Sequence, residues 1–274
     1  MKERALQLIR EASPEAKRNI LREYLQAHIL FSFQAERAFE QLAFVGGTAL
    51  RFLHGLRRYS EDLDFSLERP KTYDFQRLLN RVKSDLTKAG FDVTMHPREV
   101  SPVHSAFVRF PGLLYEFGLS PHHTEKLAIK IEIDTSPPVG ATLQTTVINR
   151  HFLVALQHHD LPSLMVGKLH ALLSRSYAKG RDIYDLLWYL SRSEPTVPNI
   201  PLLRNALAQT KWHGLQVTTE TWRSVVEHRL REVDFAEVVD DVGPFLESPE
   251  ERTLLTLQIV LAALHQGQGP ENPN

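Results

Sequence analysis

The sequence predicts an α+β protein in which a sheet-containing core precedes a mainly helical half. Residues 44–67, FVGGTALRFLHGLRRYSEDLDFSL, have the pattern of a strand, a tight turn, a helix and a second strand. Residues 127–134 alternate between apolar and polar side chains, as in a strand that is buried on one face. Residues 200–265 show apolar positions at helical spacing, with prolines and glycines between the segments.

The remaining elements follow in order along the chain. Residues 1–40 have helical spacing of apolar residues, and Ser13-Pro14 is typical of a helix start. An amphipathic helix is predicted for residues 75–89, which Gly90 would end. Three further segments alternate well enough to be strands: 91–95, 104–110 and 113–118. We therefore expect an N-terminal helical segment (1–40), a core (41–150), a helical C-terminal lobe (151–265) and a polar tail that is disordered (266–274).

Composition limits the classes of protein that fit. With 274 residues, of which 42% are hydrophobic, the chain is long enough to form a real core. Cysteine is absent, which excludes disulfides and thiolate chemistry. The N-terminal residues carry charges throughout, so they predict neither a signal peptide nor a membrane span, and we expect a cytoplasmic protein that does not contact a membrane. A net charge of −1 argues against coating of nucleic acid by the overall field but permits a local basic patch.

The segment 44–67 also carries candidate chemistry. Asp62 and Asp64 share one face of the predicted strand, roughly 7 Å apart, and paired carboxylates of this kind suit Mg2+. Gly46 and Gly47 would let backbone N–H groups approach an anion at the start of the helix that begins near Thr48. Each feature alone is common in turns and on solvated strands. Together they predict a site for a nucleoside triphosphate.

A third acidic ligand is expected on the strand 127–134. Its polar face carries Lys130, Glu132 and Asp134, and a carboxylate on a neighbouring strand is what a two-metal site requires. We favour Glu132 for this role and keep Asp134 as the alternative. The plainer interpretation is an exposed polar face.

Residues 162–192 hold a second group of charged residues. Lys168 and Arg175, seven apart, share a helix face, and Asp182 and Asp185 share the polar side of the next helix. One interpretation is a helical hairpin in which Asp182 caps its helix and Asp185 makes a surface pair. The other is that Lys168 neutralises triphosphate charge while Asp185 orients it or a neighbouring ligand.

These motifs resemble a known enzyme family. GGTALR, followed by Arg58, Ser60 and DLDF, resembles the nucleotidyltransferase signature of the polymerase-β superfamily. The resemblance is closer to the AbiEii/AbiGii toxins, which include the tRNA-modifying MenT-type toxins, and KLHALLSR with DIYDLL resembles their second motif. The spacer of six residues between Arg175 and Asp182 is longer than is typical of the family. The resemblance implies a polymerase-β-like mixed sheet with flanking helices.

The resemblance and the residue patterns together assign roles to the candidate residues. The catalytic group comprises Asp62, Asp64, Lys168 and Asp185. Nucleotide contacts are expected from Gly46, Gly47, Thr48, Arg51, Ser60, Lys130, Arg175 and Asp182, with Arg58 as a further cation. Two Mg2+ ions, which Mn2+ could replace, are expected on Asp62 and Asp64 with Glu132 or Asp134.

The implied function is that of a toxin in an abortive-infection toxin–antitoxin pair, active in phage defence. It would transfer a nucleotide from an NTP to an RNA acceptor, the 3′ end of tRNA, and so block translation. A cognate antitoxin is expected, and phosphorylation of Ser60 would place about two negative charges against the carboxylates and disable the site. Two alternatives remain at this point: a transferase that modifies a protein or small molecule, and a protein that binds a nucleotide without turnover.

Overall fold

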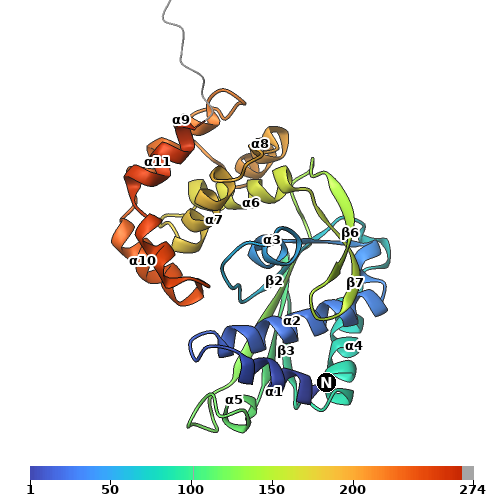
Figure 1. The fold of residues 1–274 in the computed structure, drawn as a ribbon. Helices are drawn as coiled ribbons and strands as arrows, with labels where there is room; N and C mark the ends of the chain where they lie inside the picture. Colours follow the sequence, from blue (N-terminus) through green and yellow to red (C-terminus); the bar gives the residue numbers. More distant parts are fainter. Residues whose placement is uncertain (101, 267–274) are drawn as a thin grey trace, which may run out of the picture. The chain divides into compact units, whose positions relative to one another are not determined.

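The structure is a computed structural model that describes residues 1–100 and 102–266. The chain divides into two compact units (Figure 1). The core unit comprises Met1–Pro137 and Leu143–His158, and the second unit comprises Pro138–Thr142 and the chain from His159 onward. The predicted tail, 266–274, lies outside the described residues except for its first residue.

The core unit is built on a mixed seven-stranded sheet with the order β3-β4-β5-β2-β1-β7-β6. β2 pairs antiparallel with β1 and parallel with β5, and β1 pairs parallel with β7. This arrangement confirms the predicted α+β class with a mixed sheet. The strands are β1 (Leu42–Val45), β2 (Leu63–Leu67), β3 (Thr94–Val100), β4 (Val103–Phe110), β5 (Leu127–Asp134), β6 (Leu143–Asn149) and β7 (Leu153–His159).

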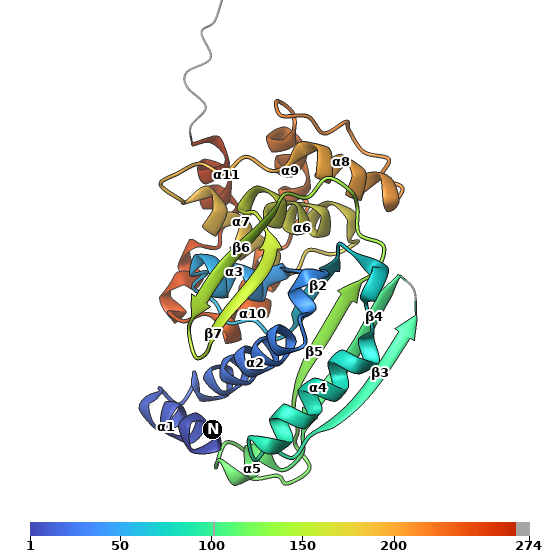
Figure 2. The ribbon, with the colours of Figure 1, turned by 90° about the vertical axis from the view of Figure 1, so that its right-hand side faces the viewer.

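One face of the sheet forms the core because the strands alternate as predicted. Ile129, Ile131 and Ile133 of β5 are completely buried, whereas the residues between them are partly exposed. Helices α2 (Lys17–Ala35) and α4 (Phe75–Lys88) lie across the buried face (Figure 2). The core unit also contains α1 (Lys2–Glu11), α3 (Gly46–His54), α5 (Leu113–Glu116), η1 (Ala38–Glu40) and η2 (Pro70–Thr72).

Two segments have another secondary structure than the sequence prediction, and the strand predicted for 91–95 begins only at Thr94. The segment 113–118 was expected to be a strand but begins with helix α5, because Gly112 adopts φ 69° and the Phe117 N–H donates to Leu113 O. Leu113 and Leu114 are both buried, and a strand would place such neighbours on opposite faces. Residues 153–159, expected within the helical lobe, form strand β7, whose Val154 and Leu156 point inward at strand spacing.

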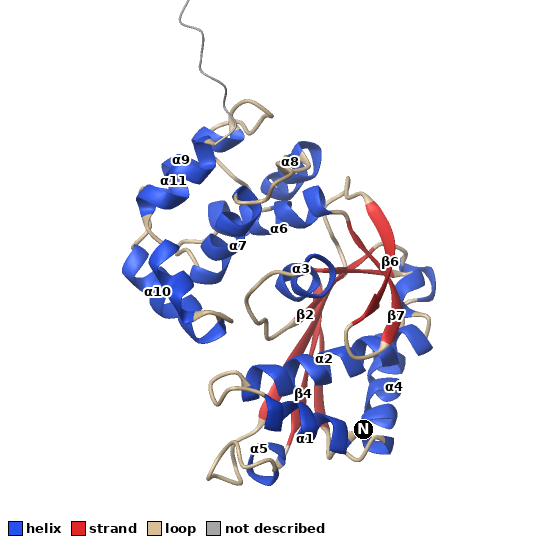
Figure 3. Cartoon of the chain, in the orientation of Figure 1, coloured by secondary structure: helices blue, strands red, loops and turns tan. Residues whose placement is uncertain are grey.

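In its described residues, the second unit consists of helices and loops (Figure 3). Trp222, which is 1% exposed, lies in its core. In the part of the chain that the structure describes, no helix has the length and apolarity needed to cross a membrane. The elements are α6 (Leu161–Ser174), α7 (Gly180–Leu190), α8 (Ile200–Gln209), α9 (Trp222–Leu230), α10 (Phe235–Val242), η3 (Gly243–Phe245), η4 (Pro249–Leu254) and α11 (Leu257–His265).

Candidate active site

The turn from β1 into α3 is shaped by two glycines that polar side chains approach closely. Gly46 has φ 79°, a conformation that side-chain-bearing residues rarely adopt. A Cβ there would lie 3.0 Å from both Cβ and Cγ of Asp64 and closer still to its carboxylate. At Gly47 a Cβ would lie 2.7 Å from Arg58 Nη2 and 3.1 Å from Ser60 Oγ. The polar side chains predicted to form the site therefore fill the space that side chains at Gly46 and Gly47 would need.

The acidic residues are aligned by strand pairing. Asp64 is the register partner of Val45 on β1 and of Glu132 on β5, so the two carboxylates lie on neighbouring strands. Asp62 immediately precedes β2, and its carbonyl accepts a hydrogen bond from the buried Thr48 hydroxyl. The side chains of Asp62, Asp64 and Glu132 are all partly exposed. The polar face predicted for β2 and β5 thus presents its carboxylates next to the glycine turn.

The two alternatives for the third carboxylate lie at different distances from this turn. Glu132 pairs with Asp64, whereas Asp134 pairs with Ser66, two residues farther from Gly46. Asp134 Oδ1 accepts the Ser136 N–H at 2.9 Å, and burial together with the charge of Glu68 raises the pKa of Asp134 despite that hydrogen bond. Glu132 instead contacts Lys130, with 2.7 Å between Oε1 and Nζ. The register therefore favours Glu132 as the neighbour of Asp64.

Thr48 and Arg51 lie in supporting positions. The Arg51 side chain is 3% exposed, its guanidinium binds Glu23, and it lies 4.2 Å from the centroid of the Tyr59 ring. Its Nη1 donates to the Leu56 carbonyl at 3.2 Å. Arg51 thereby connects α3 to the loop that leads to Ser60, while the Thr48 hydroxyl holds Asp62.

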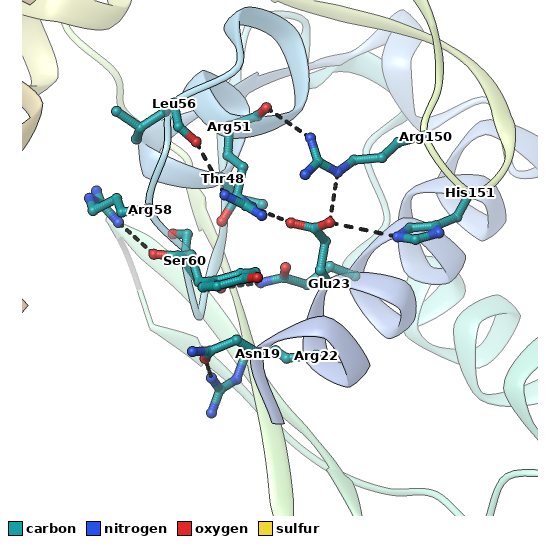
Figure 4. A network of polar contacts seen from close by, with 12 residues as sticks. Asn19, Arg22, Glu23, Thr48, Arg51, Leu56, Arg58, Ser60, Arg150 and His151 are labelled. Atoms are coloured by element: carbon teal, nitrogen blue, oxygen red, sulfur yellow. Dashed lines mark hydrogen bonds and ion pairs between the residues drawn. The ribbon is translucent and has the colours of Figure 1, made fainter. Parts of the chain in front are cut away.

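Glu23 on α2 is the centre of a charged network (Figure 4). Its buried carboxylate binds Arg51, lies 2.7 Å from Arg150 Nε and is 3.7 Å from His151 Nε2. Burial alone would raise the pKa of Glu23, but His151 and the two guanidinium groups outweigh burial and lower the pKa to about 2. Nearby, Gln26 donates to the Ser60 carbonyl at 3.0 Å, so α2 holds the loop as well as the helix.

The second group of predicted residues comes together within the second unit. Lys168 Nζ lies 2.8 Å from Asp185 Oδ2 and 3.2 Å from Asp182 Oδ1, and Arg175 Nη1 lies 2.6 Å from Asp182 Oδ2. Asp185 is completely buried, and Asp182 is 5% exposed. The interpretation of Asp182 as a helix cap is wrong, because Lys179 is the N-cap of α7 and no side chain caps it. Two cations and two buried carboxylates thus form a cluster whose charges balance, with the Arg175 side chain 42% exposed.

Comparison with known proteins identifies the family of this chain. Residues 28–257 match the profile of the AbiEii family, described as nucleotidyl transferase toxins of type IV toxin–antitoxin systems. The chain belongs to the AbiEii family.

Two solved structures share the fold of this AbiEii protein. One is a Helicobacter pylori protein described as a provisionally assigned nucleotidyltransferase, with 21% identity, a TM-score of 0.54, and coverage of 89% of this chain and 93% of that one. The other is JHP933 from Helicobacter pylori, with 20% identity, a TM-score of 0.54, and coverage of 90% and 91%. No curated protein matches the chain.

Family membership defines the activity at the coarse level. The protein is a nucleotidyltransferase, and an AbiEii toxin uses an NTP as its substrate and has an antitoxin as its partner. The residues that could cradle the triphosphate are the glycines of the α3 turn, and the carboxylates beside them are hard oxygen donors.

The sequence did not reveal the network around Glu23. Its partners lie far along the chain, Arg51 by 28 residues and Arg150 by 127, so no local pattern joins them. The sequence also did not identify Phe107 as a candidate site residue. Phe107 is an exposed aromatic residue on β4 beside Lys130. The strict alternation of β4 and β5 is the one signal that could have placed Phe107 on the face that carries Glu132.

Proposed function

We propose that this AbiEii nucleotidyltransferase transfers a nucleotide from an NTP to the 3′ end of tRNA, and that the modified tRNA no longer supports translation during phage infection. The observation that carries the proposal is that the Asp64 carboxylate fills the space of a Cβ at Gly46, with Glu132 in register beside Asp64. This places acidic groups next to the backbone N–H groups of a helix N-terminus. Such groups bind phosphate oxygens, and carboxylates near them suit metal-dependent phosphoryl chemistry.

The donor set fits Mg2+, with Mn2+ as a substitute. Asp62, Asp64 and Glu132 supply only carboxylate oxygens, the ligands that hard cations prefer. Within residues 1–100 and 102–266, no three His, Asp or Glu side chains stand close enough together to be a ready metal site. Lys130 currently neutralises Glu132, and release of that ammonium would make the carboxylate available. A bound Mg2+ would supply Lewis acidity at the acceptor hydroxyl and charge neutralisation at the leaving pyrophosphate.

The other candidate residues have two roles: some contact the nucleotide, and others hold the site in place. The N–H groups at Gly46 and Gly47 bind the β- and γ-phosphates, and Ser60 and Lys130 contact the nucleotide from the adjoining loop and strand. Thr48 and Arg51 act by holding the Asp62 backbone and the α3 helix in place. The acceptor hydroxyl attacks the α-phosphorus in line, its proton passes to solvent, and the bond to the leaving pyrophosphate breaks.

The cluster of Lys168, Arg175, Asp182 and Asp185 is also required for transfer in this proposal. Its support is the match to the family's second motif and the mutual pairing of all four side chains. Lys168 lies within ion-pair distance of both aspartates, and Arg175 pairs with Asp182 at the more exposed side of the cluster.

The test measures transfer of label from each of the four α-labelled NTPs, with Mg2+, to total cellular RNA and to protein. Label at tRNA 3′ ends that disappears in the Asp62→Ala, Asp64→Ala double variant is the expected result. Asp92→Ala, an exposed aspartate on a loop of the same unit, is the matched control and should transfer normally. Label in protein alone would replace the RNA acceptor with a protein acceptor, and binding of NTP without any transfer would contradict the proposal.

A further inference from the structure

The open face of the sheet continues from Glu132 into a basic and aromatic surface. Antiparallel pairing places Ser105 of β4 opposite Glu132 and Phe107 opposite Lys130. On the next strand, His96 pairs with Phe107 and Arg98 with Ser105. Partners in register share a face, so all these side chains lie on the side of the sheet away from the buried isoleucines.

Phe107 is the apolar centre of this surface. It is 39% exposed, although the neighbouring Ala106 and Val108 are buried on the other face. The Arg109 guanidinium lies 5.2 Å from the centroid of the Phe107 ring, and Lys130 Nζ lies 5.8 Å from it. Lys130 also contacts Glu132 at 2.7 Å, so its ammonium connects the aromatic ring to the candidate active site.

On β3 and β4, the open face of the sheet carries basic side chains and no acidic ones. The open faces of β3 and β4 consist of Thr94, His96, Arg98, Val100, Val103, Ser105, Phe107 and Arg109, which include no acidic residue. Glu99, the acidic residue of β3, belongs to the opposite face because its register partner is His104, which packs against Phe75 of α4. We name the group formed by His96, Arg98, Phe107 and Arg109 the β3–β4 platform.

We propose that the β3–β4 platform binds the single-stranded 3′ end of the RNA acceptor, with one base stacked on Phe107 and the backbone phosphates next to Arg98 and Arg109. This inference rests on the proposed function and specifies how its acceptor is held. Proteins bind single-stranded nucleic acids by stacking bases on exposed aromatic rings and by placing cations along the phosphate backbone. Phe107 and the arginines beside it have this arrangement. The ring lies roughly 7 Å along the strand and 5 Å across from Glu132, about the length of one nucleotide. The platform continues from β4 onto β3, so the RNA chain could follow it beyond the first base.

Full-length variants test the platform by two binding measurements made in Mg2+. Fluorescence anisotropy follows a labelled single-stranded RNA with a free 3′-hydroxyl, and equilibrium dialysis follows an α-labelled NTP. Phe107→Ala should weaken RNA binding by about tenfold or more, the usual effect of losing one stacked base, and leave NTP binding unchanged. Phe107→Trp should restore RNA affinity. Tyr115→Ala removes a comparably exposed ring, 44% accessible, and should not alter RNA affinity.

The arginines are tested by the dependence of RNA affinity on salt. Together, Arg98→Ala and Arg109→Ala should make the fall of log K, the association constant, with log salt less steep by about 1.4, since each phosphate contact to a single strand contributes about 0.7. Arg77→Ala is the control for charge, because Arg77 lies on α4 and is 73% exposed. Its slope should match the wild type.

Each other outcome overturns the inference in a distinguishable way. An unchanged RNA affinity in Phe107→Ala, in a protein that still labels RNA, removes the platform and leaves the proposed function standing. A parallel loss of NTP affinity would assign Phe107 to the base of the nucleotide instead. A wild type that labels protein and neither binds nor labels RNA would overturn both proposals. Circular dichroism establishes that each variant is folded before binding is measured.

Discussion

The carboxylate of Asp64 occupies the space that a side chain at Gly46 would need. Gly46 also has a positive φ, so two separate constraints require glycine at this position. The relationship joins β2 to the start of α3 and sets the separation between the acidic group and the helix backbone.

Gly46→Ala should therefore impair transfer more than it impairs folding. Alanine at positive φ costs about 1–2 kcal/mol, and the displaced carboxylate should lower transfer by about 100-fold. Gly55→Ala is a matched control, because Gly55 has φ 71° and nothing lies within 4 Å of its added Cβ. Urea unfolding should show similar losses for both variants, and transfer assays should separate them. Equal activity in the two variants would mean that the position of Asp64 is unimportant.

The third carboxylate can be identified by comparing two variants of β5. Glu132→Gln should lower transfer by about 100-fold or more, because Glu132 pairs in register with Asp64. Asp134→Asn should retain activity within a few-fold, because Asp134 pairs with Ser66 and accepts the Ser136 N–H. Removing divalent metal with EDTA should stop wild-type transfer, and adding Mg2+ should restore it. The reverse order of the two variants would assign the role to Asp134.

Ser60 should be sensitive to negative charge. Its Oγ lies beside Gly47 at the helix N-terminus, and Gln26 fixes its carbonyl. Ser60→Glu should lower transfer by more than about tenfold, because the new carboxylate competes with phosphate for the Gly47 backbone and repels Asp62 and Asp64. Ser60→Ala preserves the size without the charge and should remain active. A fully active Ser60→Glu would eliminate phosphorylation of this residue as a means of control.

Much of the candidate site could be predicted from sequence because its signals are local. The alternation of Leu63 and Phe65 with the aspartates sets the phase of β2, and the alternation of Ile129 to Ile133 sets the phase of β5. Once both buried faces lie on the same side, Asp64 and Glu132 must share the other. The glycine turn and the charged pairs of α6 and α7 are local in the same sense.

The support of the site could not be predicted because it depends on long-range contacts. Arg51 belongs to a motif that suggested phosphate binding, yet its partner Glu23 lies on another helix with no pattern linking the two. The segment 113–118 had an acceptable strand pattern, but the left-handed Gly112 begins a helical turn that buries Leu113 and Leu114 together. Both the pairing of Arg51 with Glu23 and the helical turn at Leu113 depend on which side chains the folded protein buries. A short window of sequence does not show this.

Lys168 and Asp185 should be energetically coupled. Asp185 is completely buried 2.8 Å from Lys168, so removing either charge takes an ion-pair partner away from the other. Lys168→Ala and Asp185→Asn should each cost about 3–5 kcal/mol of unfolding free energy, and the double variant should cost clearly less than the sum. The exposed pair Arg37 with Glu40 is the control and should couple by less than about 1 kcal/mol. Additive losses in urea unfolding at Lys168 and Asp185 would contradict the coupling. Transfer is assayed at a temperature at which each variant is folded. Both variants should still be inactive, because the proposed function requires Lys168 and Asp185.

The charge of Glu23 should make stability depend on pH. The folded protein lowers the pKa of Glu23 from 4.5 to about 2, so the unfolded state binds a proton more readily than the folded state. The resulting stabilisation, about 3 kcal/mol, is fully present above pH 4.5 and is lost as the pH falls from there towards 2.

Glu23→Gln isolates this effect because glutamine does not titrate. At pH 7 the variant should be less stable than the wild type by about 3 kcal/mol, since Arg51 and Arg150 lose their counter-charge. Urea unfolding between pH 7 and pH 3 should show the difference shrinking on acidification, because the other acidic groups titrate alike in both proteins and cancel. Glu61→Gln, at a 35% exposed side chain 3.3 Å from Arg22, is the control and should change stability by less than about 1 kcal/mol. A difference between wild type and Glu23→Gln that stays constant over this range would contradict the lowered pKa, because it would mean that burial and the charged partners of Glu23 cancel.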